Sequence, residues 1–486
     1  MIGLDSADRG LVDQWCDSGE LPVLRSMIER GAYGRLASPP AMGDDGTWAS
    51  FSTAVSPGRH GRYFWQSLVQ GAYTLAMSRD EAWPEEPFWA ALSRSGLRVA
   101  VLDVPKCPLV AGLNGVQLAD WQVHGRDYAR TLSWPQELAE SVLGRFGDDG
   151  TDQMSEDWLC WLHALPDAKL EVFESRLLEG LAKKTLLVSE LLAQDDWDLF
   201  LVVFKEAHCV GHQCWHLLEK ADDTGPEGRR ATPVKAIYQA LDSTIGEIAG
   251  QSGPGTTVIV FSDLGMGPNH TGEHLLDRVL CRLERRLATP RQRARLMTRR
   301  IHERLTFRRR RGEDAGRSRA GRLAYQVEHN EISGAIRINL TGREPAGIVS
   351  PGREYDDCCR RLTEELLALR DPRTGDALVE SVVPAARIYP GPCQDRLPDL
   401  FAVWARTGPI TGAQSPAIGR LMSDPPGFRP GNHVPGGFYI GVGPAVTPGR
   451  RGEPASIMDL GPTVARLLRT PLLDRDGRPV PELCGP

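Results

Sequence analysis

The most constraining feature of the sequence is a short apolar run, LFLVVF, at residues 199–204. The run has the length of an ordinary β-strand and no polar alternation, which is typical of a strand covered on both faces. Polar residues follow at once, at Lys205 and Glu206. We therefore expect a buried strand that ends at residue 204, with helices packed on both sides of its sheet.

Three histidines follow this strand at helical spacing. His208, His212 and His216 stand at i, i+4 and i+8, so a helix in this segment places them roughly on one face. Neutral imidazoles four residues apart can chelate one divalent ion, and ligands bind at the ends of buried parallel strands. The alternative is a helix with exposed or hydrogen-bonded histidines. The clustering at a strand end favours the metal site.

Two other apolar runs end on an acidic residue. The N-terminal run MIGL leads into Asp5, and TTVIVFSD ends at Asp263. A helical pattern at residues 234–245 lies between the strand at 199–204 and the strand that ends at Asp263. The alternation predicts an α/β fold with a doubly wound, mostly parallel sheet and a polar rim at its carboxyl edge.

The composition is that of an ordinary soluble protein. The 486 residues can bury a large core, and the net charge of −6 argues against bulk binding of nucleic acid. No apolar run approaches the length of a membrane span, and the N-terminus lacks a basic-then-apolar signal. Ten cysteines without a CxxC pair indicate free thiols. We expect a cytoplasmic protein without membrane association, and the sequence leaves its oligomeric state open.

The chain divides into three segments. We expect residues 1–274 to form the first part of the catalytic α/β core, 275–392 a smaller α+β cap, and 393–486 the C-terminal part of the core. The cap begins with an arginine-rich stretch at 281–320. Such a stretch could bind nucleic acid or phosphate, but interleaved leucines favour an arginine-rich helical insertion.

A loop that opens at Pro39 carries the other candidate polar groups. Asp44, Asp45 and Gly46 predict a turn, followed by a short helix at 48–55. In the simpler interpretation Asp45 only caps this helix. In the functional one, carboxylates and the hydroxyl of Thr47 at a helix N-terminus form a site for an anion and its metal.

The candidate ligands fall into two groups. Histidines suit one zinc-like ion with an open coordination position, and aspartates suit a harder second ion. Two ions a few ångströms apart, with an oxygen nucleophile between them, are a known device for phosphoryl transfer. The candidates, in chain order, are Asp5, Asp44, Thr47, His208, His212, Asp263, His270 and His433.

Their order resembles the alkaline phosphatase superfamily, in particular its type I phosphodiesterase/nucleotide pyrophosphatase branch, and the resemblance covers most of the chain. The family's W-x-S-F-x-T-G-x-x-P-G-x-H-G segment is similar to residues 48–61, with Ala54 where glycine is usual. Further matches are the opening Gly3-Leu4-Asp5, the pair His208 and His212, the segment Ser262-Asp263-Leu264-Gly265-Met266, and the late Gly431-Asn432-His433.

The resemblance implies an alkaline-phosphatase-like fold and a metal-dependent hydrolase of a phosphate ester: a phosphodiester, a pyrophosphate or a phosphomonoester. It also implies two divalent ions, zinc foremost, with manganese or magnesium as alternatives at the aspartate-rich site. A small phosphorylated molecule is the expected substrate. The expected substrate-binding residues are Trp121, His124 and Asn330, with core packing as the alternative for each aromatic.

The sequence departs from the family pattern at positions of metal ligands and of the nucleophile. His208 stands where the family has an aspartate ligand, and Leu264 where it has a histidine, for which His270 or His274 could substitute. Asp44 stands in the column of the Ser or Thr nucleophile, so that Thr47 or a metal-bound hydroxide is left as the attacking group. The alternatives are a degenerate member that binds a phosphorylated ligand or partner, and a hydrolase of sulfate or phosphonate esters.

Overall fold

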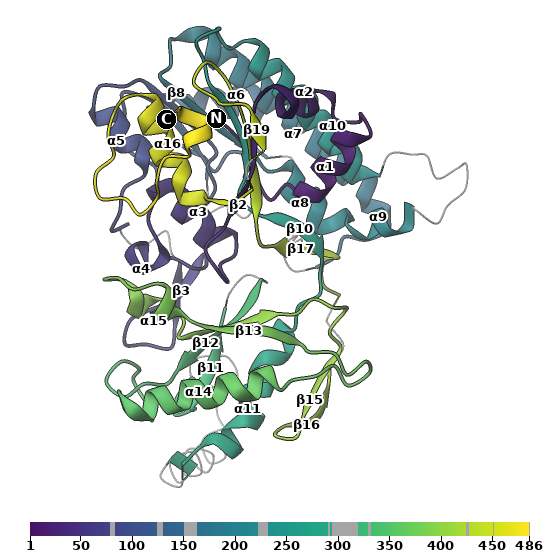
Figure 1. The fold of residues 1–486 in the computed structure, drawn as a ribbon, viewed down its shortest axis with the longest axis vertical. Helices are drawn as coiled ribbons and strands as arrows, with labels where there is room; N and C mark the ends of the chain where they lie inside the picture. Colours follow the sequence, from purple (N-terminus) through teal and green to yellow (C-terminus); the bar gives the residue numbers. More distant parts are fainter. Residues whose placement is uncertain are drawn as a thin grey trace.

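The computed structural model describes residues 1–77, 83–123, 130–149, 163–221, 232–289, 292–293, 319–328, 332–423, 427–450 and 452–485. These residues form two lobes, a larger one built on a central sheet and a smaller cap (Figure 1). Both chain ends lie in the larger lobe.

The main sheet has ten strands in the described part of the chain, in the order β19-β2-β18-β9-β1-β8-β5-β6-β7, with β20 paired to β2. Its centre, from β9 to β6, is parallel, and β18 and β7 run antiparallel to their neighbours. The predicted doubly wound, mostly parallel sheet is confirmed. The strands are β1 (Ile2–Leu4), β2 (Ala32–Ala37), β5 (Val99–Leu102), β6 (Gly115–Ala119), β7 (Leu132–Trp134), β8 (Leu199–Phe204), β9 (Val258–Ser262), β18 (Gly437–Val442), β19 (Gly449–Arg450) and β20 (Ala455–Ser456).

Helices cover both faces of this sheet, which explains the continuous apolar run of β8. Val202 and Phe204 belong to the core on one face, and Leu201 and Val203 to the core on the other. The first face packs on α1 (Arg9–Asp17), α2 (Pro22–Arg30), α6 (Gln136–Phe146), α7 (Asp167–Gln194), α8 (Glu206–Cys214) and α10 (Pro233–Gly250). The second packs on α3 (Asp44–Thr53), α5 (Phe88–Arg94), α16 (Leu460–Leu467) and α17 (Pro481–Cys484).

The cap is a four-stranded antiparallel sheet, in the order β11-β12-β14-β13, with two helices on one face. Its other face meets the loop after residue 39, where the Ser333 hydroxyl donates to the Ala41 carbonyl at 2.9 Å. The elements are α11 (Glu273–Leu287), β11 (Ala324–Val327), β12 (Ser333–Ile338), α14 (Arg353–Leu367), β13 (Val379–Pro384), α15 (Ala385–Ile388), η3 (Gln394–Arg396), β14 (Leu400–Trp404), and the hairpin β15 (Gly412–Ser415) and β16 (Gly419–Met422).

The predicted boundary between cap and core at residues 392/393 is wrong. Strand β14 lies between β12 and β13 in the cap sheet, and the following hairpin packs in the same core. The chain rejoins the larger lobe at β17 (Gly431–Val434), which pairs with β10 (Gly265–Pro268). The apolar sequence of β14 suits either sheet, so only its nonlocal pairing decides its place.

The remaining elements are short: α4 (Pro57–His60), β3 (Gln66–Leu68), β4 (Leu75–Met77), α9 (His216–Ala221) and η4 (Ile457–Asp459). Of the arginine-rich stretch, residues 290–291 and 294–318 lie outside the described part. Among the described helices, none combines the length and the apolar character that a membrane crossing requires.

A buried ion pair ties α7 to the carboxyl edge of the sheet. The Lys184 ammonium, 1 % exposed, contacts the Asp103 carboxylate at 2.8 Å and donates to the carbonyl oxygens of Gln122 and Val203. Asp103 also accepts the backbone amides of Trp121 and Gln122, each at 2.9 Å. The ends of β5, β6 and β8 are thereby held together by one lysine.

We predict that Lys184→Ala destabilises the fold by about 3 kcal/mol, because it leaves the Asp103 charge buried without its cation. The matched control is Lys183→Ala, which removes only a surface pair with Glu179 and should cost less than about 0.5 kcal/mol. Urea unfolding of the variants measures both values. Equal stability of the two variants would contradict a structural role for the buried pair.

Candidate metal centre and active site

The register of the three central strands brings their polar ends together. Leu4 pairs with Phe204 of β8, and Gly3 pairs with Phe261 of β9, so Asp5 follows its strand level with Lys205 and Asp263. The Asp5 amide continues the ladder by donating to the Phe204 carbonyl at 2.9 Å. The carboxyl edge therefore carries Asp5 and Asp263 on adjacent strands, with α8 starting beside them.

Three histidines converge at this edge. His208 and His212 lie one turn apart on α8, and His433 lies on β17. Their candidate ligand atoms all lie within 4.8 Å of one another, and the side chains are buried. The Nε2 atoms of His208 and His212 lie 2.8 Å apart. His216 instead begins the next helix, α9, and is not in the group.

The Nδ1 atoms of the two α8 histidines each have a hydrogen-bond partner. The Asp5 Oδ2 atom lies 2.9 Å from His208 Nδ1, and the Gly431 carbonyl oxygen lies 2.9 Å from His212 Nδ1. Both partners can accept, so with a metal ion bound each Nδ1 would carry the proton and each Nε2 would be free to bind the ion. Metal-binding histidines are oriented by this arrangement in general.

Close backbone packing sets the position of β17 against α8. A Cβ atom on Gly431 would lie 2.0 Å from the Gly211 carbonyl oxygen, and one on Gly211 would lie 2.6 Å from Met266 Cγ. Only glycine admits this approach. It allows the Gly431 carbonyl to reach His212, and the pairing of Met266 with His433 then directs the third imidazole to the same point.

An acidic group lies beside the histidines. The Ser6 amide donates to Asp263 Oδ1 at 2.9 Å, and the Ser6 hydroxyl lies 3.3 Å from Asp5 Oδ1. The Trp48 indole also donates to Asp5 Oδ1, at 3.2 Å. Asp44 stands four residues before Trp48 on α3, so it shares the face that meets Asp5. Asp5, Asp44 and Asp263 thus interact within one buried group.

The acidic group is short of positive charge. Burial, and then the charge of Asp44, raises the pKa of Asp5 to about 7. Burial, and then the charge of Asp5, raises the pKa of Asp263 well above its usual value. Asp263 Oδ2 and Asp44 Oδ1 are buried and have no hydrogen-bond partner. Orphaned buried carboxylate oxygens are costly, and a bound cation removes that cost. The residues present therefore fit metal binding.

Comparison with known families assigns the chain. The model of the type I phosphodiesterase/nucleotide pyrophosphatase family matches residues 1–417. The chain belongs to this family. A search of the curated proteins finds no match.

Solved structures of the alkaline phosphatase superfamily share the fold. Phosphonoacetate hydrolase from Sinorhizobium meliloti 1021, in complex with phosphonoformate, has 15 % identity and a TM-score of 0.51 over 95 % of this chain and 93 % of that one. Murine ectonucleotide pyrophosphatase/phosphodiesterase 5, an inactive form in complex with AMP, has 12 % identity and a TM-score of 0.51, over 98 % and 96 %. A mutant of alkaline phosphatase PafA has 12 % identity and a TM-score of 0.52, over 100 % and 98 %. At these identities the likeness shows the fold alone.

The position of the family's second histidine holds no ligand in this chain. Leu264 is 0 % exposed and apolar. His270, predicted as a substitute, lies on the connection from β10 to α11, and its Nδ1 lies 3.3 Å from the Arg406 carbonyl oxygen. Neither His270 nor His274 belongs to the group of three histidines. The assignment of His270 to a metal stays a prediction.

The segment around Asp44 is helical where the sequence predicts a turn. Helix α3 begins at Asp44, with Gly43 as its N-cap, so Asp44 and Asp45 occupy the first turn. The unpaired backbone amides of the first turn stabilise acidic side chains. This stabilisation offsets the low helix propensity of Gly46, so the segment is helical. Thr47 lies one turn further in, and its hydroxyl donates to the Gly43 carbonyl at 2.7 Å. That hydroxyl is engaged with the backbone of its own helix.

Of the predicted substrate-binding residues, only Trp121 lies in the described part of the chain. Trp121 lies in the core, 0 % exposed, and its indole donates to the Gly147 carbonyl at 3.0 Å. His124 and Asn330 lie outside the described residues. Nothing in the contacts of Trp121 assigns it to a ligand, so its predicted role stays a prediction.

A buried Ser–His pair in α3 and α4 is structural. The Ser50 hydroxyl lies 2.9 Å from His60 Nε2, and the Arg62 amide donates to His60 Nδ1 at 3.0 Å. Because Nδ1 is an acceptor, Nε2 carries the proton and cannot accept one from the serine. Burial, and then the charge of Arg62, lowers the pKa of His60 to about 3. The pair joins two helices and supplies no base.

Sequence reasoning missed two residues of the site, Ser6 and Trp48. Ser6 holds Asp263 through its amide, with a backbone φ of +51° that serine rarely adopts. Trp48 holds Asp5 through its indole. The adjacency of Ser6 to Asp5 and the four-residue spacing of Asp44 and Trp48 were available signals, but neither one specifies a contact.

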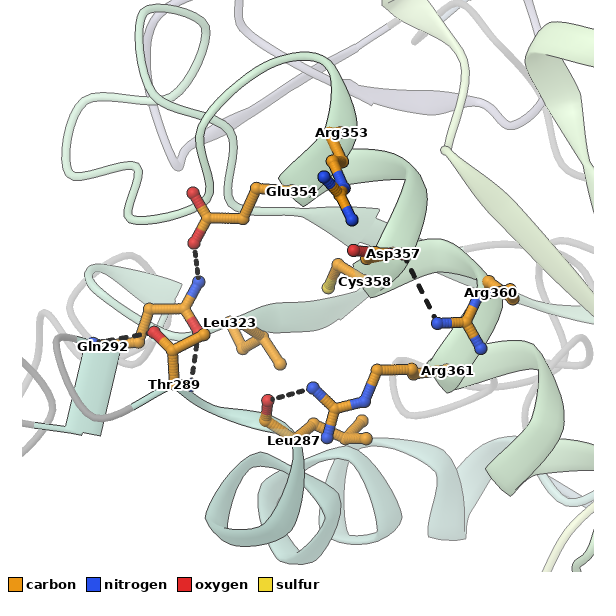
Figure 2. Close-up of a pocket in the computed structure, with 10 residues that line it drawn as sticks. All are labelled: Leu287, Thr289, Gln292, Leu323, Arg353, Glu354, Asp357, Cys358, Arg360 and Arg361. Carbon is orange, nitrogen blue, oxygen red and sulfur yellow. Dashed lines mark hydrogen bonds and ion pairs between the residues drawn. The ribbon is translucent and has the colours of Figure 1, made fainter.

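A cavity of about 390 Å³ lies in the cap, between the end of α11 and the start of α14 (Figure 2). None of the residues that line it in the described part is a histidine. Its polar groups pair locally, as Gln292 with Glu354 at 2.6 Å and Arg361 with the Leu287 carbonyl at 2.9 Å.

We predict that Asp5→Ala weakens zinc binding about 10- to 100-fold, because His208 loses the acceptor that orients it. Asp5→Asn keeps an acceptor oxygen and should weaken it less. Competition with a chromophoric chelator measures the affinity, and circular dichroism checks that the variants are folded. Wild-type zinc affinity in a folded Asp5→Ala variant would show that this hydrogen bond does not orient the metal ligand.

Proposed function

We propose that the protein hydrolyses an ester of a small phosphorylated molecule, and that hydrolysis depends on a divalent ion held by His208, His212 and His433. The observation that carries the proposal is the convergence of three buried imidazoles from α8 and β17 in a chain of the phosphodiesterase family. Three nitrogen ligands with an open position are the donor set of catalytic zinc. When bound, such an ion would offset the charge of the phosphoryl oxygens and would lower the pKa of a coordinated water.

The acidic group extends the site toward the substrate. Asp44 lies in the first turn of α3, next to the backbone amides of a helix N-terminus, and Asp263 directly follows β9. Backbone amides at such a terminus favour an anion. A phosphoryl group placed between the histidines and this terminus would meet positive charge from both sides, provided that the carboxylates hold a cation of their own. We therefore include a second ion in the proposal.

We propose water, rather than Thr47, as the attacking group. The Thr47 hydroxyl donates to the carbonyl of the N-cap residue Gly43, so it would have to rotate away from a 2.7 Å hydrogen bond to attack. The Asp44 carboxylate would be a weak nucleophile while it holds a cation. In the hydrolysis a water oxygen forms the new bond to phosphorus, and the ester oxygen leaves with a proton.

The test uses bis(p-nitrophenyl) phosphate and p-nitrophenyl phosphate as probes. Chelation should abolish turnover and zinc should restore it, and His433→Ala should lower kcat/KM at least about 100-fold. The matched control is His216→Ala, on α9 outside the group, which should change kcat/KM less than about threefold. Turnover of either probe by metal-stripped protein, or by His433→Ala at the wild-type rate, would overturn the proposal.

The attacking group is tested with Thr47→Ala beside Asp44→Asn. Thr47→Ala should keep kcat within about tenfold of wild type, whereas Asp44→Asn should lose turnover in metal-replete buffer. Loss of turnover in a Thr47→Ala protein that retains its metal would instead identify Thr47 as the nucleophile. A binding-only protein would bind zinc and phosphate and cleave neither probe.

A further inference from the structure

The two halves of the centre offer different donor atoms. The histidine group offers three nitrogens within 4.8 Å of one another. Beside it, Asp263 and Asp44 each offer one buried carboxylate oxygen that has no hydrogen-bond partner, Oδ2 and Oδ1 respectively. Asp263 is 0 % exposed and Asp44 is 6 % exposed, so water cannot readily satisfy these oxygens. Each of them points to a cation that the fold is built to receive.

Asp5 is already committed to the histidine half. Its Oδ2 lies 2.9 Å from His208 Nδ1, and its Oδ1 accepts the Trp48 indole proton at 3.2 Å. Asp5 therefore serves as the orienting carboxylate of a histidine ligand. Its charge still attracts a cation nearby, but it is not an open oxygen of the acidic half.

Among the described residues, no imidazole joins Asp44 and Asp263 in a group of three candidate ligands. The residue after Asp263 is the buried Leu264, and within the described residues the only group of three or more candidate ligands is the three histidines. Asp44 and Asp263 therefore supply two oxygens and no third protein ligand close enough to form such a group. Two carboxylates alone bind a divalent ion weakly, because most of its coordination sphere is left to water.

We propose that Asp44 and Asp263 hold a second cation of the magnesium or manganese class, and that phosphoryl oxygens of the bound substrate complete its coordination. An all-oxygen donor set suits these hard ions, and magnesium is commonly bound by one or two carboxylates plus substrate phosphates. This inference rests on the proposed function for its phosphoryl group. The centre is then asymmetric, with a resident zinc-type ion on nitrogen and an exchangeable hard ion that binds together with phosphate.

Thermodynamic linkage between Mn²⁺ and phosphate binding can be measured without following turnover. If phosphate supplies ligands to the second ion, each must tighten the binding of the other by the same factor. The experiment titrates Mn²⁺ into zinc-loaded protein and follows free Mn²⁺ by electron paramagnetic resonance, with and without inorganic phosphate, each against a protein-free blank. We expect one zinc per chain, and Mn²⁺ binding about tenfold tighter with phosphate than without it.

Variants of the acidic half locate the second ion. Asp44→Asn and Asp263→Asn should keep the zinc and lose the phosphate-dependent Mn²⁺ binding. The matched control is Asp45→Asn, in the same helical turn, where the carboxylate lies 3.7 Å from the Lys106 ammonium. That control should keep the phosphate-dependent Mn²⁺ binding. Loss of Mn²⁺ binding in all three variants alike would contradict the assignment to Asp44 and Asp263.

Leu264→His tests the missing nitrogen directly. A folded Leu264→His protein should take up a second zinc, which raises the zinc content from one to two per chain. Leu264→Asn, polar but a poor zinc ligand, is its control. If the buried site rejects the larger side chain and the protein does not fold, Asp263→Asn still decides the question.

The outcomes separate this inference from the proposed function. Two zinc ions per wild-type chain without phosphate, or Mn²⁺ affinity that phosphate does not change, would overturn the oxygen-only second site while leaving zinc-dependent hydrolysis intact. Phosphate-coupled Mn²⁺ binding in a protein that cleaves no ester would support the second site and overturn the proposed function.

Discussion

The hydrogen bond between Asp5 and His208 is the contact on which the rest of the centre depends. It joins two residues that are 203 positions apart, one at the end of β1 and one on the first turns of α8. Both partners are buried, so the bond is not exchanged for water, and it leaves Nε2 as the His208 ring nitrogen that faces His212. It exists only because β1 and β8 pair in the register that sets Leu4 against Phe204.

The same constraint explains why the site is assembled from distant segments. The parallel pairing of β8, β1 and β9 brings three strand ends to one edge, and each end contributes a polar residue or the start of a helix. The antiparallel pairing of β10 and β17 then returns the chain from the cap and places His433 opposite α8. Glycines at 211 and 431 permit the approach. The buried carboxylates repel one another, so a bound cation would stabilise this arrangement.

Much of the centre was predictable because its signals are local. The unbroken apolar run of β8 indicates burial on both faces, and the spacing of His208 and His212 indicates a shared helical face. His433 needed the family's Gly-x-His pattern, because nothing near it in the sequence marks a ligand. The place of β14 was not predictable, because Leu400–Trp404 is equally apolar in either sheet. The start of α3 was mispredicted because two aspartates and a glycine also form turns, whereas here the carboxylates lie at a helix N-terminus.

The central claim is that three imidazoles hold one metal ion at the carboxyl edge of the sheet. Anomalous diffraction at the zinc absorption edge, from crystals of the zinc-loaded wild-type protein, tests it most directly. We predict a peak about 2 Å from one nitrogen each of His208, His212 and His433. A crystal with zinc in solution but no peak among these nitrogens, or with its strongest peak elsewhere, would contradict it.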